Sequence, residues 1–524
     1  MHFEPAPHTT QNWRLEKPAA TGRRGMAVAQ SRSAAEAGVA VLDAGGNAID
    51  AAVATALALA AVEPWNSGLG GTGNAVVHRA GEARAKVVDF GPTAPGRLDP
   101  ARFPLTGRVA SDLFAWPEVE GDINIHGPMS FVIPSAVAGY AEMHGRWGRL
   151  PLSEVAAPAV ALARRGLPQD WYTTLKVANS AAILRRYPES ARVYLRDGLP
   201  PVPPYQGGLA YFTLGRLAET LEQLARAGWR DVYDGEIAAS IVADVDAMGG
   251  ILSAEDLAGC RARVTPALEG PWCGRTLQAP GPLTAAPTAL DVLRRMAGMA
   301  PGPEPDAAWY VALARALKAA YAERLESLGD AEPPAAQSCT THLSVCDVEG
   351  SMVAMTSTLL SSMGSRVVLP GTGILMNNGV MWFDPRPGRP NSIAPGKRPL
   401  TNMLPVVLRA GEGGPSMAAG ASGGRRIMAA VLQLTAFVAG FGMTAEAAAH
   451  QPRIDVSSPH MVTADARLGS GILHALEADG PTEVFEHGVL PINFACPNLV
   501  VRRGGVCIGI SDAASPWSAA VAQA

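Results

Sequence analysis

The first part of the chain contains a long apolar stretch whose composition is typical of helices. The stretch from Ser33 to Val62 is rich in Ala, Val and Leu, and it is interrupted only by GGN at 45–47. Because Gly ends helices and Asn caps them, we expect one helix at about 33–44 and a second at about 47–62, with Asn47 as its N-cap.

A Gly-rich segment, EPWNSGLGGTGNAVVH at 63–78, follows these helices and leads into a predicted strand. The segment AKVVDFG at 85–91 is its expected hairpin partner. No Lys-Ser or Lys-Thr pair follows the glycines and no βαβ unit encloses them, so nucleotide binding is not predicted. From about 136 to 330 the pattern is mainly helical, and 306–329 predicts a long helix that ends at Gly329.

The pattern changes after that helix. Residues 330–339, DAEPPAAQSC, show neither the hydrophobic period of a helix nor that of a strand. They therefore predict a flexible, cleavable linker. Polar and apolar residues then alternate in THLSVCD and SMVAMTST, on either side of the turn DVEG. This pattern predicts a hairpin that begins at Thr340 and sets Thr340 opposite Thr358 to within one residue. This pair has two possible explanations. Thr is a good strand former and cross-strand Thr pairs are common, or the two hydroxyls take part in a reaction.

Composition indicates small-molecule chemistry. The 524 residues are 48% hydrophobic and carry 43 basic and 47 acidic side chains, for a net charge of −4, which gives no footprint for nucleic acid or an anionic membrane. The longest apolar run, Ala51 to Val62, is far shorter than the ~20 residues that cross a bilayer as a helix. The first 25 residues lack the features of a secretory signal, so we expect a cytoplasmic protein.

Cysteine spacing predicts neither a metal site nor a disulfide framework. The six cysteines occur without a CxxC motif or a paired His spacing, and free thiols are the expected state. No cofactor is predicted.

A linker that ends at a strand-initial threonine suits one particular chemistry. If the chain cuts itself before that residue, the freed α-amino group can act as general base for the hydroxyl of the same threonine. Four segments in order, TTHLSV (340–345), PGTGILMNN (370–378), PGKRPLTNMLPVV (395–407) and GASGGRRI (420–427), resemble the small subunit of the γ-glutamyltranspeptidase family of N-terminal-nucleophile hydrolases. The resemblance continues upstream through AEAG (35–38), GGNAIDAAVA (45–54), VEPWNSGLGGTG (62–73), DFGPTAP (89–95) and HGPMSFVIPSAVAG (126–139).

The resemblance implies an α+β fold, a four-layer αββα sandwich formed jointly by two subunits cut from one precursor. The cut would fall between Cys339 and Thr340, giving a large subunit of residues 1–339 and a small subunit of residues 340–524. The two pieces would stay associated, since each sheet depends on strands from both, and the heterodimer could form a homo-oligomer.

The resemblance also assigns catalytic roles. Thr340 matches the nucleophile and Thr358 the supporting hydroxyl, as the hairpin register independently suggests. Gly423 and Gly424 match the pair whose backbone N–H groups form the oxyanion hole, where glycine allows close approach of the backbone.

Several positions of the substrate site depart from the family pattern. Gly91 follows Asp-Phe where transpeptidases have the arginine that holds the substrate α-carboxylate. Met381 and Trp382 stand in place of the acidic pair that binds the α-amino group. The γ-glutamyl pocket is therefore expected to be altered.

Two further departures concern Leu360, where the family has asparagine, and Thr401–Asn402, where it has two serines. Leu360 and Trp382 suggest a small, flattened pocket. Arg425 is the candidate for a replacement carboxylate clamp because it directly follows the glycine pair, and Arg366 is the reserve. Structural roles are expected for His126, His342, Arg398 and Arg426.

Three hypotheses follow. The first is a self-processed amidase that hydrolyses a small carboxylate-bearing amide, similar to the oxamate amidohydrolase and acylase branches of the family. The second is a γ-glutamyltransferase or glutathione hydrolase with a modified pocket, and the third is an unprocessed, non-catalytic binding protein.

Overall fold

The computed structural model describes residues 15–110, 116–299, 301–327, 338–411, 414–489 and 492–524. Two seven-stranded sheets form its centre. The first sheet contains, in spatial order, β1 (Ala20–Gly22), β20 (Val506–Ser511), β19 (Cys496–Arg503), β15 (Pro415–Ser422), β14 (Val406–Arg409), β11 (Arg275–Ala279) and β10 (Leu268–Trp272). The second contains β21 (Ala519–Ala522), β2 (Met26–Ala29), β12 (Ser338–Cys346), β13 (Met352–Ser361), β3 (Thr72–His78), β4 (Lys86–Phe90) and β9 (Arg263–Pro266).

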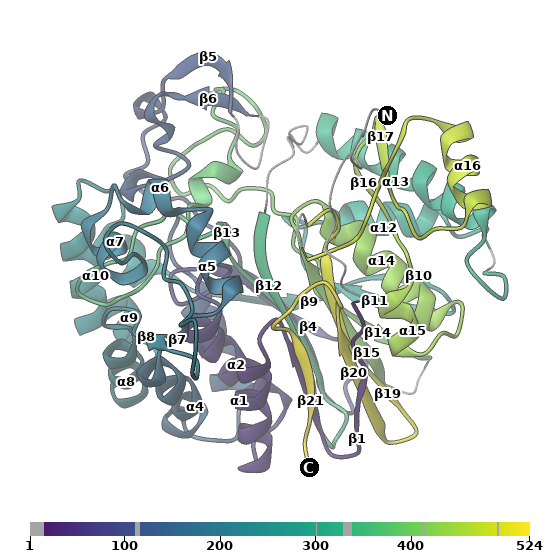
Figure 1. Ribbon diagram of the computed structural model, residues 1–524, viewed down its shortest axis with the longest axis horizontal. Helices are drawn as coiled ribbons and strands as arrows, with labels where there is room; N and C mark the ends of the chain where they lie inside the picture. The colour runs from purple at the N-terminus through teal and green to yellow at the C-terminus, as the bar shows by residue number, and fades with distance from the viewer. Residues whose placement is uncertain (1–14, 111–115, 300, 328–337, 412–413, 490–491) are drawn as a thin grey trace.

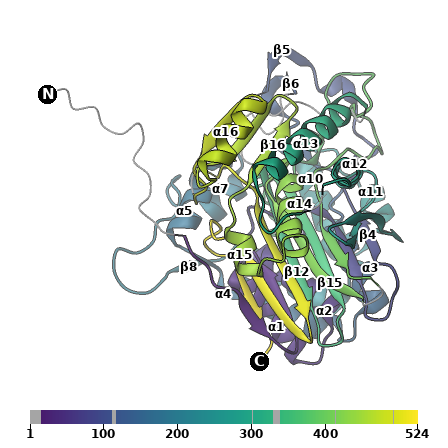
Figure 2. The same ribbon diagram turned by 90° about the vertical axis from the view of Figure 1, so that its right-hand side faces the viewer.

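Helices cover the outer face of each sheet, on the left and right of Figure 1. The second sheet is covered by α1 (Arg32–Asp43), α2 (Ala48–Val62), α3 (Ala136–Trp147), α4 (Leu152–Arg165), α5 (Trp171–Ala178), α6 (Ala181–Leu184), α7 (Pro188–Tyr194), α8 (Leu217–Ala227), α9 (Asp231–Asp234), α10 (Glu236–Ala247) and α11 (Ala254–Gly259). The first sheet is covered by α12 (Ala286–Arg295), α13 (Ala307–Ser327), α14 (Arg426–Ala439), α15 (Ala445–His450) and α16 (Ser470–Asp479), several of which face the viewer in Figure 2.

Smaller sheets lie outside this centre. They are the pairs β5 (Leu105–Val109) with β6 (Pro117–Val119) and β7 (Leu167–Pro168) with β8 (Tyr211–Phe212), and the three strands β16 (Ile454–Ser458), β17 (Met461–Asp465) and β18 (Thr482–Phe485).

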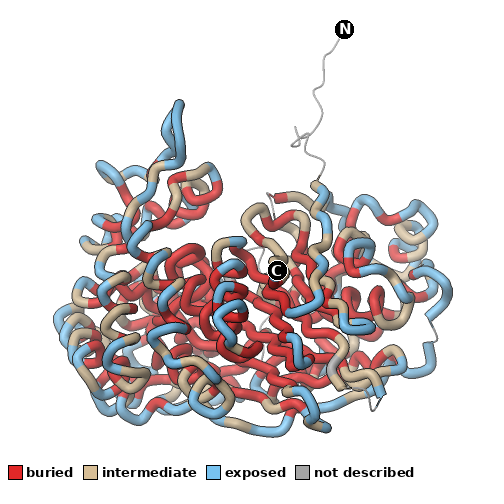
Figure 3. Tube along the Cα trace, turned by 90° about the horizontal axis from the view of Figure 1, so that it is seen from below, coloured by how far each residue is buried: buried red, intermediate tan, exposed pale blue. Residues whose placement is uncertain are grey.

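Three apolar layers hold the sandwich together, and strand alternation creates them. Along β2, Ala27 and Ala29 pack against the helices on one side, whereas Met26 and Val28 pack between the two sheets. A third layer joins the first sheet to α12–α16. Buried residues consequently fill the middle of the molecule (Figure 3). The αββα sandwich expected from the resemblance is confirmed.

The predicted start of the second helix is confirmed in detail. Asn47 caps α2 with its side-chain oxygen, which accepts bonds from the N–H groups of Ile49 and Asp50 at 2.9 and 3.1 Å. Asp347, in the turn between β12 and β13, accepts a 3.0 Å bond from the N–H of Ala48. A carboxylate at a helix N-terminus is favoured by the helix dipole, so this contact ties the hairpin turn to α2.

The predicted hairpin, β12 and β13 in the middle of the second sheet, needs one correction. Its strand does not begin at Thr340, because Ser338 and Cys339 already belong to β12 and pair with Ser361 and Leu360. The linker expected over 330–339 therefore cannot include its last two residues, since β13 extends far enough to offer them backbone partners. Residues 330–337, and the expected helix end at Gly329, lie outside the described residues.

Close contact between α1 and α2 gives a test of the packing. A Cβ on Gly38 would lie 2.3 Å from the Thr55 hydroxyl, which is itself bonded at 2.8 Å to the Ala51 carbonyl. We expect Gly38→Ala to lower the free energy of unfolding by about 1–3 kcal/mol through overpacking. Gly145, in α3, is the matched control: a Cβ there meets nothing within 4 Å, so Gly145→Ala should raise stability by about 0.5–1 kcal/mol. Calorimetric melting temperatures should move in opposite directions.

Candidate active site

The hairpin brings the two predicted threonines together. Pairing joins Thr341 to Ser357, and a bulge in the register falls at Thr340. The Thr340 hydroxyl donates to the Thr358 hydroxyl across 3.4 Å, and both side chains are buried. The predicted contact between Thr340 and Thr358 is confirmed. The hairpin register predicted it only to within one residue, and the bulge shifts the pairing by one residue at this point.

Thr358 is held in place by its own strand. Its hydroxyl oxygen accepts a 2.9 Å bond from the backbone N–H of Leu360. Leu360 has a φ of 87°, a left-handed conformation that is uncommon for a residue other than Gly. The unusual backbone therefore turns an N–H group back onto the hydroxyl that faces the expected nucleophile.

Two histidines make the structural hydrogen bonds expected of them. His342 lies between the hydroxyls of Thr356 and Ser344, at 2.9 and 3.1 Å, and burial lowers its pKa to about 3. His126 bonds the Tyr187 hydroxyl at 2.8 Å, and burial, aided by nearby arginines, lowers its pKa to about 4. Both rings are therefore neutral near pH 7.

The glycine pair has the backbone geometry that requires glycine. Gly423 and Gly424 have φ values of 140° and 60°, and a Cβ on Gly423 would lie 2.8 Å from Ala495. The pair directly precedes Arg425 and the N-terminus of α14, where the helix dipole favours negative charge. Backbone N–H groups at such a position can stabilise an oxyanion.

Thr340 and Gly423 line the same small cavity, which has a volume of about 40 Å³. Its wall is polar and is formed by Gln30, Glu63, Asn66, Tyr172, Lys176, Thr340, Ser422, Gly423, Arg426, Ile492, Cys496 and Ser515. A cavity of this size can hold water. The nucleophile and one expected oxyanion donor therefore share a polar space.

Glu63 is one of the cavity residues that the sequence did not single out. Its carboxylate accepts a short hydrogen bond from the Thr341 hydroxyl and a 2.7 Å bond from the Asn66 amide. Burial raises the Glu63 pKa to about 7, although these two bonds and the positive charge of Lys176 oppose the rise. The only available signal was an acidic residue directly after an apolar helix, and this signal does not identify its partner.

An apolar cluster occupies the region of the substrate-site departures. It consists of Ala110, Trp116, Ile125, Leu360, Met381 and Trp382, all buried. The Trp116 indole donates a 3.2 Å bond to the Met381 carbonyl, so the ring is fixed rather than loosely packed. Leu360 connects this cluster to the hydroxyl of Thr358. None of these six described side chains carries a carboxylate that could pair with an ammonium group.

At Gly91, where the arginine is missing, a guanidinium from a distant part of the chain lies beside the backbone. Arg398 forms a two-pronged ion pair with Asp89, at 2.8 and 2.6 Å. A Cβ on Gly91 would lie 2.6 Å from the Arg398 guanidinium. The guanidinium therefore excludes a side chain from position 91 unless it moves, and its ion pair agrees with the structural role expected for Arg398.

Thr401 and Asn402 contact a buried arginine. The Thr401 hydroxyl donates to the Leu283 carbonyl at 3.0 Å. Arg324, from α13, donates to the Thr401 carbonyl and to the Asn402 side-chain oxygen, each at 2.9 Å. These two positions thus join α13 to the loop before β14, and their expected contact with substrate stays a prediction.

The two candidate carboxylate clamps have different surroundings. Arg425 is buried at the start of α14, and its carbonyl accepts a 2.6 Å bond from the Tyr321 hydroxyl. Arg366 donates to the Ser361 hydroxyl at 2.7 Å and to the Gly364 carbonyl at 2.6 Å, so it braces the loop after β13. Neither arginine is among the described residues that line the Thr340 cavity, and contact of either one with substrate stays a prediction.

Metal and membrane features are not found in the described parts of the chain. Among those residues no group of three or more His, Cys, Asp or Glu side chains could hold a metal ion. The cysteines whose side chains the structure describes are free, and they are 260, 273, 346, 496 and 507. In the same residues no helix is long and apolar enough to span a bilayer.

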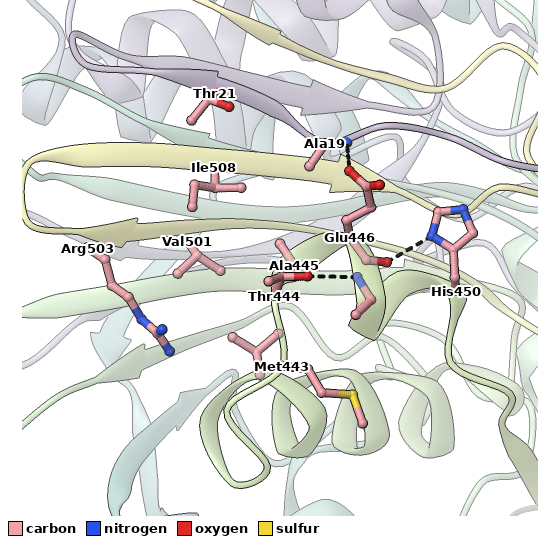
Figure 4. A pocket seen from close by; sticks show the side chains of 12 residues that line it. Ala19, Thr21, Met443, Thr444, Ala445, Glu446, His450, Val501, Arg503 and Ile508 are labelled. Atoms are coloured by element: carbon pink, nitrogen blue, oxygen red, sulfur yellow. Dashed lines mark hydrogen bonds between the residues drawn. The ribbon is translucent and has the colours of Figure 1, made fainter. Parts of the chain in front are cut away.

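A larger pocket of about 640 Å³ lies between β1, β19, β20 and α15 (Figure 4). Two of its polar side chains bond to the backbone of lining residues: the Glu446 carboxylate accepts from the Ala19 N–H at 2.8 Å, and His450 bonds the Glu446 carbonyl at 2.8 Å. None of the described residues lining it belongs to the predicted site. The pocket is therefore separate from the candidate active site.

The fold and the threonine pair define the class of N-terminal-nucleophile hydrolases. The Gamma-glutamyltranspeptidase family profile matches residues 34–339 and 332–521, and the chain belongs to this family. The Acylase ACY 1 proenzyme of Pseudomonas sp. (strain V22) is 31% identical over 480 residues, which cover 84% of each chain. The Glutathione hydrolase proenzyme of Escherichia coli (strain K12) is 27% identical over 543 residues, covering 94% of this chain and 90% of that one.

The solved structures agree on the fold. Cephalosporin acylase from Bacillus halodurans superposes with a TM-score of 0.82 and 24% identity, covering 100% of this chain and 99% of that chain. At this identity the likeness bears on architecture alone. Both the curated relatives and the family profile identify the chain as a hydrolase of the γ-glutamyltranspeptidase family.

The hydroxyl of Thr358 gives the test of this geometry. Thr358→Val keeps a β-branched side chain but removes the group that faces Thr340, so self-cleavage and amide hydrolysis should each fall by about 10²-fold. Thr358→Ser keeps the hydroxyl and should retain most of both activities. Denaturing electrophoresis measures the first activity and amine release the second. Equal rates for the Val and Ser variants would show that the hydroxyl is not used.

Proposed function

We propose that the chain cuts itself between Cys339 and Thr340, and that the mature enzyme hydrolyses a small carboxylate-bearing acyl amide. The observation that carries the proposal is the 3.4 Å contact between the hydroxyls of Thr340 and Thr358, beside a cavity that Gly423 also lines. Interleaving of strands from residues 1–339 and 340–524 in both sheets supports a heterodimer that stays together after the cut.

In the mature enzyme, the new α-amino group of Thr340 takes the proton of its own hydroxyl. The hydroxyl oxygen attacks the amide carbonyl, and the oxyanion is stabilised by N–H groups of the Gly423–Gly424 segment. The leaving amine takes the proton, and an acyl ester on Thr340 remains. Water then hydrolyses the ester and releases the acid.

Substrate preference follows from the apolar cluster. A γ-glutamyl group carries an α-ammonium that requires an acidic partner, and Met381 and Trp382 supply none. Burying a charged group without a partner is costly, so the cluster favours acyl groups without an ammonium. The 31% identity to an enzyme named an acylase supports the same choice.

Arg425 is proposed to bind the substrate carboxylate, as in oxamate or a glutaryl amide. Its backbone follows the glycine pair directly, and a guanidinium can bind a carboxylate through two parallel hydrogen bonds. The alternative function is glutathione hydrolysis, which the similarity to glutathione hydrolase proenzymes favours.

Processing gives one test of this proposal. Purified protein should run as two fragments on a denaturing gel, and N-terminal sequencing of the smaller one should read Thr-Thr-His-Leu. Thr340→Ala removes the nucleophile of both reactions, so it should leave one intact chain without amidase activity. Thr340→Ser is the control that keeps a hydroxyl and should still be cut. A wild-type chain that stays whole would exclude the mechanism.

Substrate specificity gives a further test of the proposed function. The wild type should hydrolyse a glutaryl anilide with a kcat/KM at least about 10²-fold above that for a γ-glutamyl anilide, because the ammonium of the latter is left unpaired. Arg425→Met should lower kcat/KM for the glutaryl anilide by about tenfold or more, since it removes a charged hydrogen-bond donor.

A neutral butyryl anilide is the matched control, because it has no carboxylate for Arg425 to bind. Its turnover by Arg425→Met should equal that by wild type, and self-cleavage should be unchanged. Equal losses for both anilides would mean that Arg425 supports the fold or the oxyanion site. A preference for the γ-glutamyl anilide would instead favour the glutathione hydrolase.

A further inference from the structure

Self-cleavage poses a problem that turnover does not. Before the cut, the nitrogen of Thr340 is a peptide amide and cannot act as a base. An alcohol is a poor nucleophile unless a base takes its proton. If the chain cuts itself as proposed above, the uncut chain must therefore contain a second proton acceptor close to Thr340.

The cavity that Thr340 lines contains several titratable side chains: Glu63, Tyr172, Lys176, Arg426 and Cys496. Glu63 is the carboxylate among them, and an ionised carboxylate is a group that only accepts hydrogen bonds. Burial raises the pKa of the Cys496 thiol to about 12, so this thiol keeps its proton at neutral pH. Glu63 is the member of this set that can be anionic at neutral pH.

Glu63 is also anchored to the strand that would be cut. It follows α2 directly, and its carboxylate bonds the hydroxyl of Thr341, the residue after the nucleophile. The Asn66 amide fixes the second carboxylate oxygen at 2.7 Å. The 40 Å³ cavity can hold water between Glu63 and Thr340.

We propose that Glu63 is the acid–base residue of self-cleavage, exchanging protons with Thr340 through water in this cavity. The Thr340 oxygen bonds to the carbonyl carbon of residue 339 while its proton passes to Glu63. The bond from that carbon to the Thr340 nitrogen then breaks, and the nitrogen takes the proton back from Glu63. Water hydrolyses the resulting ester, which regenerates the hydroxyl and leaves a carboxylate on residue 339 and a free amine on Thr340.

The acidity of Glu63 suits this exchange. Its pKa of about 7 means that both the anion and the acid are populated at neutral pH, as a group that accepts and then returns a proton requires. Because the anion is the active form, the rate of cleavage should rise with pH through about 7 and then level off. The charges that face it in the cavity are those of Lys176 and Arg426.

The test follows cleavage of full-length chain made by cell-free translation with labelled methionine, sampled on denaturing gels between about pH 5.5 and 8.5. Glu63→Gln should cleave at least about 10²-fold more slowly than wild type and should lose the rise with pH. Glu63→Asp keeps a carboxylate and should restore a pH-dependent rate. A purely structural role for Glu63 would lower the yield of folded chain but would leave the pH profile of the remainder unchanged.

Asp455→Asn is the matched control. Asp455 is another buried carboxylate whose pKa burial raises, to about 6, but it bonds Ser457 and does not line the cavity. Its variant should keep the wild-type pH profile. Normal cleavage by Glu63→Gln, with Thr340→Ala uncut, would overturn the role of Glu63 alone. Cleavage of Thr340→Ala at the same bond would overturn the proposed function itself.

Discussion

Antiparallel pairing of β12 with β13 fixes the positions of Thr340 and Thr358, on which the other parts of the site converge. The hairpin lies inside a seven-stranded sheet, with β2 on one side and β3 on the other, so its register cannot slip without disturbing both neighbours. A shift by one residue would send Thr340 to the opposite face of the sheet. The bulge at Thr340 and the left-handed Leu360 are local departures that this rigid pairing can sustain.

Two environments of opposite character lie near the nucleophile. Glu63, Lys176 and Arg426 give the cavity a charged wall, whereas Leu360 and Trp382 belong to an apolar cluster that begins beyond Thr358. Water and proton transfer suit the first environment, and acyl recognition without charge pairing suits the second. The separation allows the substrate region to change without altering the groups that handle protons.

Sequence patterns predicted the parts of the structure that depend on short stretches. The cap at Asn47 and the meeting of Thr340 with Thr358 follow from local periodicity and turn length. The partner of Glu63 lies 278 residues away, and no periodicity encodes such a contact. The guanidinium of Arg398 beside Gly91 was hidden for the same reason. Predicting either contact requires knowing which strands become neighbours.

The strand order of the second sheet has a consequence for synthesis on the ribosome. Strands β2 and β3 are made early, but β12 and β13 lie between them and emerge only after more than half of the chain. Until then, β2 and β3 lack the neighbours that would hold them roughly 14 Å apart. The apolar faces of α1 and α2 have no completed sheet to cover during that interval. The core around β2 and β3 therefore cannot be completed until β12 and β13 have been synthesised, and the segments made earlier keep apolar surface exposed in the meantime.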